Sequence, residues 1–421
     1  MFGVPISKTT LAIIFTIVLF NKTCRSQDYY EEIVYPDSIN IISMLPLNFD
    51  TIFIGGSTQY ATGGVYRSFD SGITWEYVGL NGLSIYCMSH GNGDTIYAGT
   101  IGVYRSNNLG ESWERISPIE QNVISISGFF PDDIFIGYWG GIMRSLDNGN
   151  TWDTSLVLSQ NTVINTILPV GENEIYAGGT AYTAQDAGVF KSADLGEIWN
   201  YIGLVGYNIQ SLGFNSNQDL FAGCFYSGLL KTSNGGLTWE TVLPNRDAVS
   251  LVIEFDEIYV GCENQSFPNG GIYYSPDNGL TWENRTYNIT NNRIKDIVIT
   301  PDQFLYSLSR YESTVLGPAL NRSVNPVFIN ESNQDKNVLV QIFPNPASDF
   351  FQISINQKFL LEENIKIFIY NQKGQMLESD SLVLPPDYFC PTINITELTS
   401  GIYYVKLVIG KNKYLLKLVV I

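Results

Sequence analysis

Apolar and polar positions alternate in short stretches that recur about every forty residues over most of the chain. A unit opens with an apolar stretch such as LSIYCMS (83–89), and a short polar turn leads to a second one, TIYAGT (95–100). A loop of variable length then leads to a third stretch, GVYRS (102–106), and a polar octet separates it from a fourth. Four short strands joined by turns predict one antiparallel sheet per unit.

The octet is the most regular part of the unit, and it occurs six times. Six of the seven tryptophans stand at its last position. Such a repeat, at this period and with four strands per copy, is typical of a β-propeller in which each unit is one blade. The copies are SFDSGITW (68–75), SNNLGESW (106–113), SLDNGNTW (145–152), SADLGEIW (192–199), TSNGGLTW (232–239) and SPDNGLTW (275–282).

A seventh unit lacks its fourth strand. It covers IKDIVIT, PDQ, FLYSLS and GPALNRS between residues 294 and 323, while YYEEIVYPD (29–37) precedes the first unit without a partner of its own. A closed ring leaves no blade with an open edge, so we expect residues 29–37 to complete the seventh blade. The fold class predicted is therefore all-β, with a seven-bladed propeller and six blades as the alternative.

The first 26 residues read as a signal peptide. Lys8 precedes the apolar run LAIIFTIVLF (11–20), which is shorter than the roughly 20 residues needed to span a bilayer. We expect cleavage near Ser26, and a lipoprotein attached through Cys24 is the alternative. No later apolar run is long enough for a transmembrane helix, so we expect an exported mature chain without one.

Charge divides the rest of the chain in two. The formal charge is −18, and residues 28–337 hold 34 acids and 13 bases, whereas residues 338–421 hold seven of each. This shift predicts a propeller over 27–325, a linker over 326–337 and a separate domain over 338–421. The acidic balance argues against nucleic acid or an anionic membrane as a partner. With one histidine, His90, and no CxxC pair, we expect no metal and no cofactor.

The octets resemble the Asp-box, or BNR repeat, S-x-D-x-G-x-T-W of sialidases, sortilin-type receptors, xyloglucanases and photosystem assembly propellers. In this motif the Asp or Asn side chain can accept backbone hydrogen bonds inside a tight turn, and the Gly can take a positive φ. The Trp is expected to pack between blades, so we assign the motif a structural role. Its residues here are Asp70, Gly72, Trp75, Asn108, Gly110, Trp113, Asp147, Gly149, Trp152, Asp194, Gly196, Trp199, Asn234, Gly236, Trp239, Asp277, Gly279 and Trp282.

The last eighty residues have no forty-residue period. Their alternating strands predict a small Ig-like β-sandwich, and they resemble the type IX secretion sorting domain of the Bacteroidota. The resemblance implies the type IX machinery as a partner, passage through the periplasm, and a final place outside the cell or on its surface. An Ig-like accessory domain for carbohydrate or adhesion is the alternative. The residues that carry the resemblance include Pro344, Asn345, Pro346, Gly374, Gly401, Lys413 and Lys417.

No catalytic residues emerge from the sequence. Arg67, Arg105 and Arg144 occupy one repeat position, which indicates structural repetition and not the converging arginines of a sialidase. The variable loops between the second and third strands carry aromatic residues suited to a glycan or protein ligand. We therefore predict a secreted or surface binding propeller, with a sialidase-like or xyloglucanase-like glycoside hydrolase as the alternative. The candidate binding residues are Tyr60, Trp139, Tyr182, Phe225, Tyr226 and Phe267.

Overall fold

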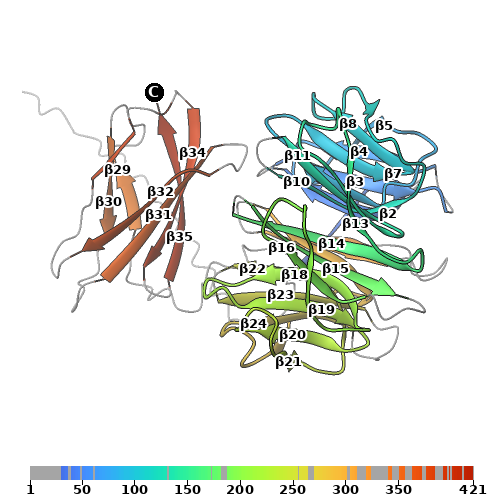
Figure 1. The fold of residues 1–421 in the computed structure, drawn as a ribbon. Helices are drawn as coiled ribbons and strands as arrows, with labels where there is room; N and C mark the ends of the chain where they lie inside the picture. Colours follow the sequence, from blue (N-terminus) through green and yellow to red (C-terminus); the bar gives the residue numbers. More distant parts are fainter. Residues whose placement is uncertain are drawn as a thin grey trace, which may run out of the picture.

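The structure is a computed structural model of the chain, shown in Figure 1. It describes residues 30–323, except 37–38, 48–49, 60–61, 130–131, 172, 182–186, 255, 264–269, 301–303 and 311–318. Beyond these it describes 340–343, 350–355, 363–371, 376–384, 392–395, 398, 401–409 and 412–420. The expected signal peptide, Cys24 and the linker lie outside the described residues.

The described part of residues 30–323 forms seven four-stranded antiparallel sheets, which confirms the seven-bladed propeller. We name the strands of each blade A to D in chain order. Blades 1 to 3 consist of β2 (Asn40–Pro46), β3 (Ile52–Ser57), β4 (Gly64–Ser68) and β5 (Glu76–Gly79); β6 (Cys87–His90), β7 (Ile96–Thr100), β8 (Gly102–Ser106) and β9 (Glu114–Arg115); and β10 (Val123–Phe129), β11 (Asp133–Tyr138), β12 (Gly141–Ser145) and β13 (Asp153–Val157).

Blades 4 to 7 continue the same order. They consist of β14 (Thr162–Val170), β15 (Glu174–Ala181), β16 (Val189–Ser192) and β17 (Asn200–Gly203); β18 (Asn208–Phe214), β19 (Leu220–Phe225), β20 (Gly228–Thr232) and β21 (Glu240–Leu243); β22 (Asp247–Glu254), β23 (Glu257–Glu263), β24 (Gly271–Ser275) and β25 (Glu283–Asn284); and β26 (Ile294–Ile299), β27 (Leu305–Ser309) and β28 (Leu320–Ser323) with β1 (Tyr30–Ile33).

Strand β1 closes the ring as strand D of blade 7. It pairs with β28 from Tyr30 opposite Ser323 to Ile33 opposite Leu320, as the unmatched N-terminal stretch predicts. The side chain of Asn288, in the loop after blade 6, accepts a hydrogen bond from the Tyr30 amide and donates one to its carbonyl. The ring thus joins the two ends of the propeller through backbone pairing and gives blade 7 the same four strands as the other blades.

The apolar core lies between neighbouring blades. Every residue of β3 is buried, whereas strand β5 at the outer edge of the same blade is exposed or half-buried. Phe53 of blade 1 packs in one cluster with Ile96 and Ala98 of blade 2. An inner strand covered on both faces needs apolar side chains on both, which explains why strands B read as unbroken apolar runs such as IFIGG.

The C-terminal region is also all-β, as expected. One sheet has the order β29 (Val340–Phe343), β30 (Phe350–Ile355) and β33 (Thr392–Asn394). A second has the order β32 (Met376–Leu384), β31 (Glu363–Asn371), β34 (Gly401–Ile409) and β35 (Asn412–Val420). Buried positions alternate along the second sheet, as in Ile367 and Ile369 or Val405 and Leu407, so one of its faces is a core face.

Cys224 and Cys262, at equivalent positions of adjacent blades, are buried free thiols, and Cys87 is free as well. Burial raises the pKa of all three thiols, which keeps them protonated and unreactive. Within the described residues there is no group of three or more His, Cys, Asp or Glu able to hold a metal ion. The same part of the chain contains no helix long and apolar enough to cross a membrane.

Candidate functional site

Each octet forms a turn held by its own side chains. In the third copy the Thr151 amide and hydroxyl donate to Asp147 at 2.8 and 2.6 Å, and these bonds lower the pKa of Asp147 to about 2. The Ser145 hydroxyl donates to the same carboxylate and accepts from the Gly149 amide. In the second copy Asn108 accepts from the Ser112 amide at 3.0 Å, so an uncharged side chain makes the same turn.

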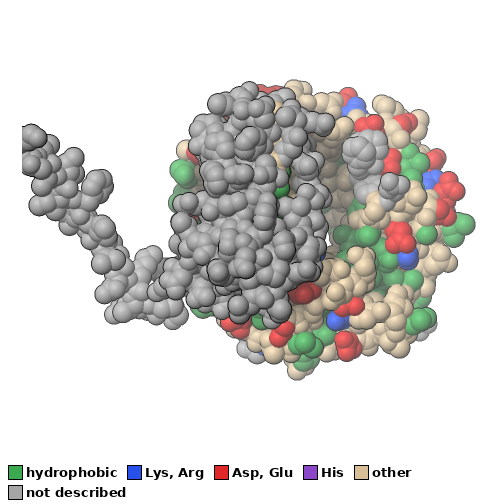
Figure 2. All heavy atoms as spheres, turned by 90° about the vertical axis from the view of Figure 1, so that its left-hand side faces the viewer, with side chains coloured by type: hydrophobic (Ala, Val, Ile, Leu, Met, Phe, Trp, Pro, Cys, Tyr) green, Lys and Arg blue, Asp and Glu red, His purple; other side chains and the backbone are tan. Residues whose placement is uncertain are grey.

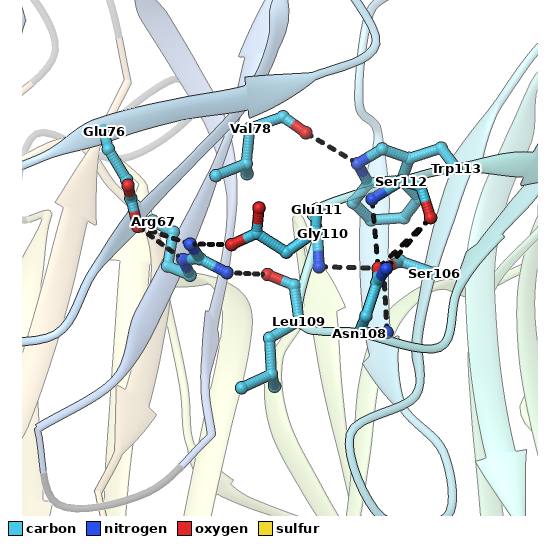
Figure 3. A network of polar contacts seen from close by, with 10 residues as sticks. All are labelled: Arg67, Glu76, Val78, Ser106, Asn108, Leu109, Gly110, Glu111, Ser112 and Trp113. Atoms are coloured by element: carbon cyan, nitrogen blue, oxygen red, sulfur yellow. Dashed lines mark hydrogen bonds and ion pairs between the residues drawn. The ribbon is translucent and has the colours of Figure 1, made fainter.

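The octet also connects each blade to the one before it. The Trp113 indole donates to the carbonyl of Val78 in blade 1 at 2.8 Å, and Trp152 donates to that of Ile116 in blade 2 at 2.8 Å (Figure 3 shows the first of these). Trp75 of blade 1 donates to Val34, which directly follows the closing strand β1. The tryptophans therefore hold blades together around the ring, including across its closure.

The repeated arginines work in the opposite direction along the ring. Figure 3 shows Arg67 of blade 1 reaching the octet of blade 2, where its guanidinium donates to the Leu109 carbonyl and pairs with Glu111 at 2.7 Å. Arg105 contacts the Asn148 carbonyl of blade 3 in the same way, and Arg144 donates to the Leu195 carbonyl of blade 4 at 2.6 Å. The three arginines join blades and do not converge on one ligand position.

Trp152→Ala is expected to destabilise the propeller by about 2 to 4 kcal/mol, somewhat less than the usual range for a fully buried aromatic, because the indole is half-buried. The loss combines packing between blades 2 and 3 with the hydrogen bond to Ile116. Chemical denaturation of the purified protein measures it. Asp147→Asn is the matched control and should change the midpoint little, since Asn108 and Asn234 already make this turn. If the Trp152→Ala variant is as stable as the wild-type protein, the indole does not stabilise the contact between blades 2 and 3.

The face opposite the octets is formed by the B–C and D–A loops. Of the six candidate aromatic residues, Trp139, Phe225 and Tyr226 are described, whereas Tyr60, Tyr182 and Phe267 lie outside the described residues. Tyr226 is 58% exposed, and its ring meets Phe225 edge to face with the centroids 4.7 Å apart. Its amide donates to the Asp247 carboxylate of the next blade at 3.0 Å, which fixes this loop against blade 6. Trp139 is half-buried, and its backbone forms an isolated β-bridge with Val163 of blade 4.

The innermost strands carry a ring of residues that the sequence reading missed. The A strands contact one another in order around the ring, including β2 with β26. In six blades the A–B pairing shifts by one residue near the start of strand A, and such a bulge redirects the side chain of the extra residue. All of these bulge residues are half-buried: Ile42, Ile124, Asn165, Gln210, Val249 and Lys295. The signal lay in a recurring triplet at the start of strand A, an apolar residue, a variable residue and, in five of the six blades, Ser or Thr.

The bulge residues differ around the ring. Those of blades 1 and 3 are isoleucines, whereas blades 4, 5 and 7 contribute Asn165, Gln210 and Lys295. Asn165 donates to the Ile209 carbonyl at 2.7 Å, and Lys295 donates to the Ile42 carbonyl across the junction of blades 7 and 1. Desolvation lowers the pKa of Lys295 to about 8. The polar bulge residues therefore lie in blades 4, 5 and 7, with Val249 of blade 6 between the last two.

A buried carboxylate near Lys295 orients a partly exposed arginine. Glu263 ends β23 directly opposite Asp247, and its side chain is 2% exposed. One carboxylate oxygen lies 2.9 Å from Nε of Arg310, whereas the other has no hydrogen-bond partner and lies 3.8 Å from Arg293. Burial raises the pKa of Glu263, and the two arginines oppose that shift. The Arg310 side chain is 45% exposed, so Glu263 orients a guanidinium group on a side chain that is partly open to solvent.

These features define an exported β-propeller with a C-terminal export domain. Residues 341–421 match the family model of the secretion system C-terminal sorting domain, which confirms the predicted sorting function of the tail. This domain directs the chain through type IX secretion to the cell surface or the medium. The family match covers the tail only, and no curated protein sequence matches the chain.

Solved structures support the propeller fold. YCF48 from Cyanidioschyzon merolae is 14% identical with a TM-score of 0.54, over 70% of this chain and 98% of that one. PorZ, an essential bacterial surface component of the type IX secretion system of Porphyromonas gingivalis, is 14% identical with a TM-score of 0.51, over 96% of this chain and 60% of PorZ. The GH74 xyloglucanase of Xanthomonas campestris is 13% identical with a TM-score of 0.56, over 77% of this chain and 59% of that one. At such identities the similarity concerns the fold alone.

Proposed function

We propose that the chain is a binding propeller that type IX secretion delivers outside the cell, with its ligand held on the B–C and D–A loop face. The proposed organisation is a signal peptide at 1–26, the propeller at 27–325, a linker at 326–337 and an Ig-like sorting domain at 338–421. The observation that carries the binding role is the exposed Tyr226, tied by its amide to Asp247. An aromatic ring fixed in an exposed position suits recognition better than packing.

The chemistry of this face favours a ligand with both apolar and acidic groups. Tyr226 and Phe225 offer apolar ring surface, and Arg310 offers guanidinium donors oriented by the buried Glu263. An oriented guanidinium binds carboxylates through paired hydrogen bonds. An acidic oligosaccharide is therefore the first ligand class to test, and an acidic segment of a protein is the second. The octet residues have structural roles in this proposal and do not contact the ligand.

A glycoside hydrolase is the competing proposal. It is favoured by the pair Glu263 and Asp247, two buried carboxylates at opposite register positions, one of which has a raised pKa. Such enzymes use two carboxylic groups at the bond to be cleaved. The ion pairs of Glu263 with Arg310 and Arg293 argue against it, because both arginines oppose protonation of the carboxylate and Arg310 occupies one of its oxygens.

Glycan-array binding with the purified propeller should identify ligands that Tyr226→Ala and Arg310→Ala each weaken about tenfold or more, the loss expected for a central aromatic or arginine contact. Leu280→Ser is the control, because Leu280 is 82% exposed on an octet turn of the opposite face. Equal binding by all three variants would exclude this loop face as the ligand-binding site. Release of sugar from a sialoside or a xyloglucan by the wild-type protein, abolished in Glu263→Gln, would replace the binding proposal with the hydrolase.

A further inference from the structure

Blades 4 and 5 share a cluster of uncharged polar side chains near the B–C and D–A loop face. We call this set the amide cluster: Asn165, Thr180, Asn208 and Gln210. Its strands β14, β15 and β18 contact one another in the ring (Figure 1). The Thr180 hydroxyl accepts a hydrogen bond from Nδ2 of Asn165 at 2.7 Å and one from Nε2 of Gln210 at 3.3 Å. It donates its own proton to Oδ1 of Asn208.

A backbone carbonyl of blade 5 fixes the direction of each amide. Nδ2 of Asn165 lies 2.7 Å from the carbonyl oxygen of Ile209, and because a carbonyl only accepts, the NH2 group has to face it. The same NH2 group donates to Thr180, so the single hydroxyl proton goes to Asn208. Nε2 of Gln210 donates to that same oxygen of Asn208. The inner contacts therefore use the NH2 groups of Asn165 and Gln210 and the amide oxygen of Asn208.

The other end of each amide is left for a ligand. These ends are Oδ1 of Asn165, Oε1 of Gln210 and Nδ2 of Asn208. None of the three atoms makes a hydrogen bond to a described residue, and none is among the buried polar atoms that lack a partner, so they are open to solvent. The amide cluster thus offers two acceptors and one NH2 donor, and it carries no charge.

Gln210 is not required by the fold. It is the bulge residue of blade 5, and the equivalent bulges of blades 1, 3 and 6 form around the apolar residues Ile42, Ile124 and Val249. The Gln210 amide contacts only other members of the amide cluster. Asn165 differs, because its NH2 group also joins blades 4 and 5. The glutamine at this position is therefore better explained by a ligand than by the packing of the ring.

An aromatic pair borders the amide cluster. Asn208 is paired with Phe225 in the ladder between β18 and β19, and paired residues share one face of a sheet. Asn208 contacts blade 4 through Thr180, so Phe225 belongs to that side of blade 5 as well. The ring of Phe225 meets the exposed Tyr226 edge to face. Uncharged hydrogen-bonding groups and apolar ring surface therefore adjoin each other at this edge of blade 5.

This combination suits a neutral sugar. A sugar hydroxyl can donate to an amide oxygen or accept from an NH2 group, whereas a carboxylate only accepts and would meet two amide oxygens that repel it. Residues 28–337 hold 34 acids and 13 bases, and acidic side chains are scattered over the propeller surface visible in Figure 2. The resulting negative field opposes the approach of an acidic protein segment but has little effect on a neutral sugar unit.

We propose that the amide cluster is a subsite for a neutral sugar unit of an oligosaccharide. Hydroxyl groups of the sugar donate to the amide oxygens of Asn165 and Gln210 and accept from the NH2 group of Asn208. The proposal rests on the proposed binding role of the loop face, and it reduces the two ligand classes considered there to carbohydrate. An acidic unit of the same oligosaccharide is left to Arg310.

Two substitutions test the subsite with residues that the ring already accommodates. Isoleucine occupies the position of Gln210 in blades 1 and 3, and Val163 occupies the position of Asn208 in blade 4. Gln210→Ile and Asn208→Val in the full chain should each weaken binding to an array of neutral and uronic-acid-containing oligosaccharides about fivefold or more, the effect of one lost hydrogen bond. Ile42→Val, at the bulge of blade 1, is the matched control and should bind like wild type.

The other outcomes separate this proposal from the binding role of the loop face. If both variants bind every sugar like wild type while Tyr226→Ala weakens binding, the amide cluster is not a subsite and the loop face remains the binding site. If the chain binds an array of acidic peptides and no oligosaccharide, the ligand is a protein segment and only the sugar subsite is refuted. A wild-type chain that binds neither array refutes both. Thermal unfolding identifies a misfolded variant, in which case the other variant decides.

Discussion

A chain that begins at residue 36 instead of residue 27 is expected to lose most of the stability of the propeller. The deletion removes strand β1, so β28 is left as an open edge and blade 7 has three strands. It also removes Tyr30, which is 2% exposed and packs with Tyr259, Tyr274 and Ile289. Loss of a buried aromatic alone costs about 3 to 5 kcal/mol, and a typical domain has only about 5 to 15 kcal/mol in total.

Thermal and urea unfolding of the two purified chains measure this effect, with aggregation of the shorter one as a further expected sign. Tyr30→Ala in the longer chain is the graded variant, because it keeps the backbone pairing of β1 with β28 and removes only the buried ring. The unfolding midpoint of this variant should fall between those of the two chains. If the shorter chain unfolds cooperatively at the wild-type midpoint, ring closure by β1 contributes nothing to stability.

Deleting residues 338–421 is expected to leave the propeller folded and to retain it in the periplasm. The ring closes through β1 and β28, and every blade is complete without the tail. The deletion removes the ion pair that Lys406 forms with Glu254, but without the tail water can solvate the Glu254 carboxylate, so the unfolding midpoint should change little. Export should nevertheless fail, because the residues that match the sorting domain family are gone.

Cell fractionation with an antibody against the propeller checks the location of the truncated protein. The reciprocal control joins residues 338–421 to an unrelated periplasmic protein, which should then appear outside the cell. Normal surface display of the truncated chain would show that the tail is an accessory module. Loss of the propeller from all fractions would instead mean that it needs the tail to fold, and purification of the truncated chain distinguishes this result.

Much of the propeller could be predicted because a short sequence motif specifies each octet turn and this motif repeats along the chain. Each octet makes its own turn, as the hydrogen bonds of Thr151 and Ser145 to Asp147 illustrate. The motif therefore forms the same turn wherever it occurs. Six copies at one period, together with an unmatched strand at the N-terminus, were enough to predict seven blades and the closure by β1. The tail could be predicted for a related reason, since its resemblance covers a continuous stretch of sequence.

The candidate site depends on residues that only the folded ring brings together. Glu263 and Arg310 are separated by the last two strands of blade 6 and the first two of blade 7, and the sequence around each resembles an ordinary loop. The redirected side chains of Asn165, Gln210 and Lys295 depend on β-bulges, which arise from the register between two strands and not from the residue itself. Exposed aromatic residues could be proposed from sequence, but the anchoring of Tyr226 by Asp247 required the contact between blades 5 and 6.

By itself, the sequence determined the all-β class, the number of blades, the ring closure, the structural role assigned to the octets and the export route. These follow from local turns and from the period of apolar strands, which neighbouring residues specify. Only the tertiary structure decided that Arg67 joins two blades, that Glu263 orients Arg310, and that Lys406 meets Glu254 across two domains. Such pairs are far apart in the chain, and their energy depends on burial and distance, which a linear pattern does not contain.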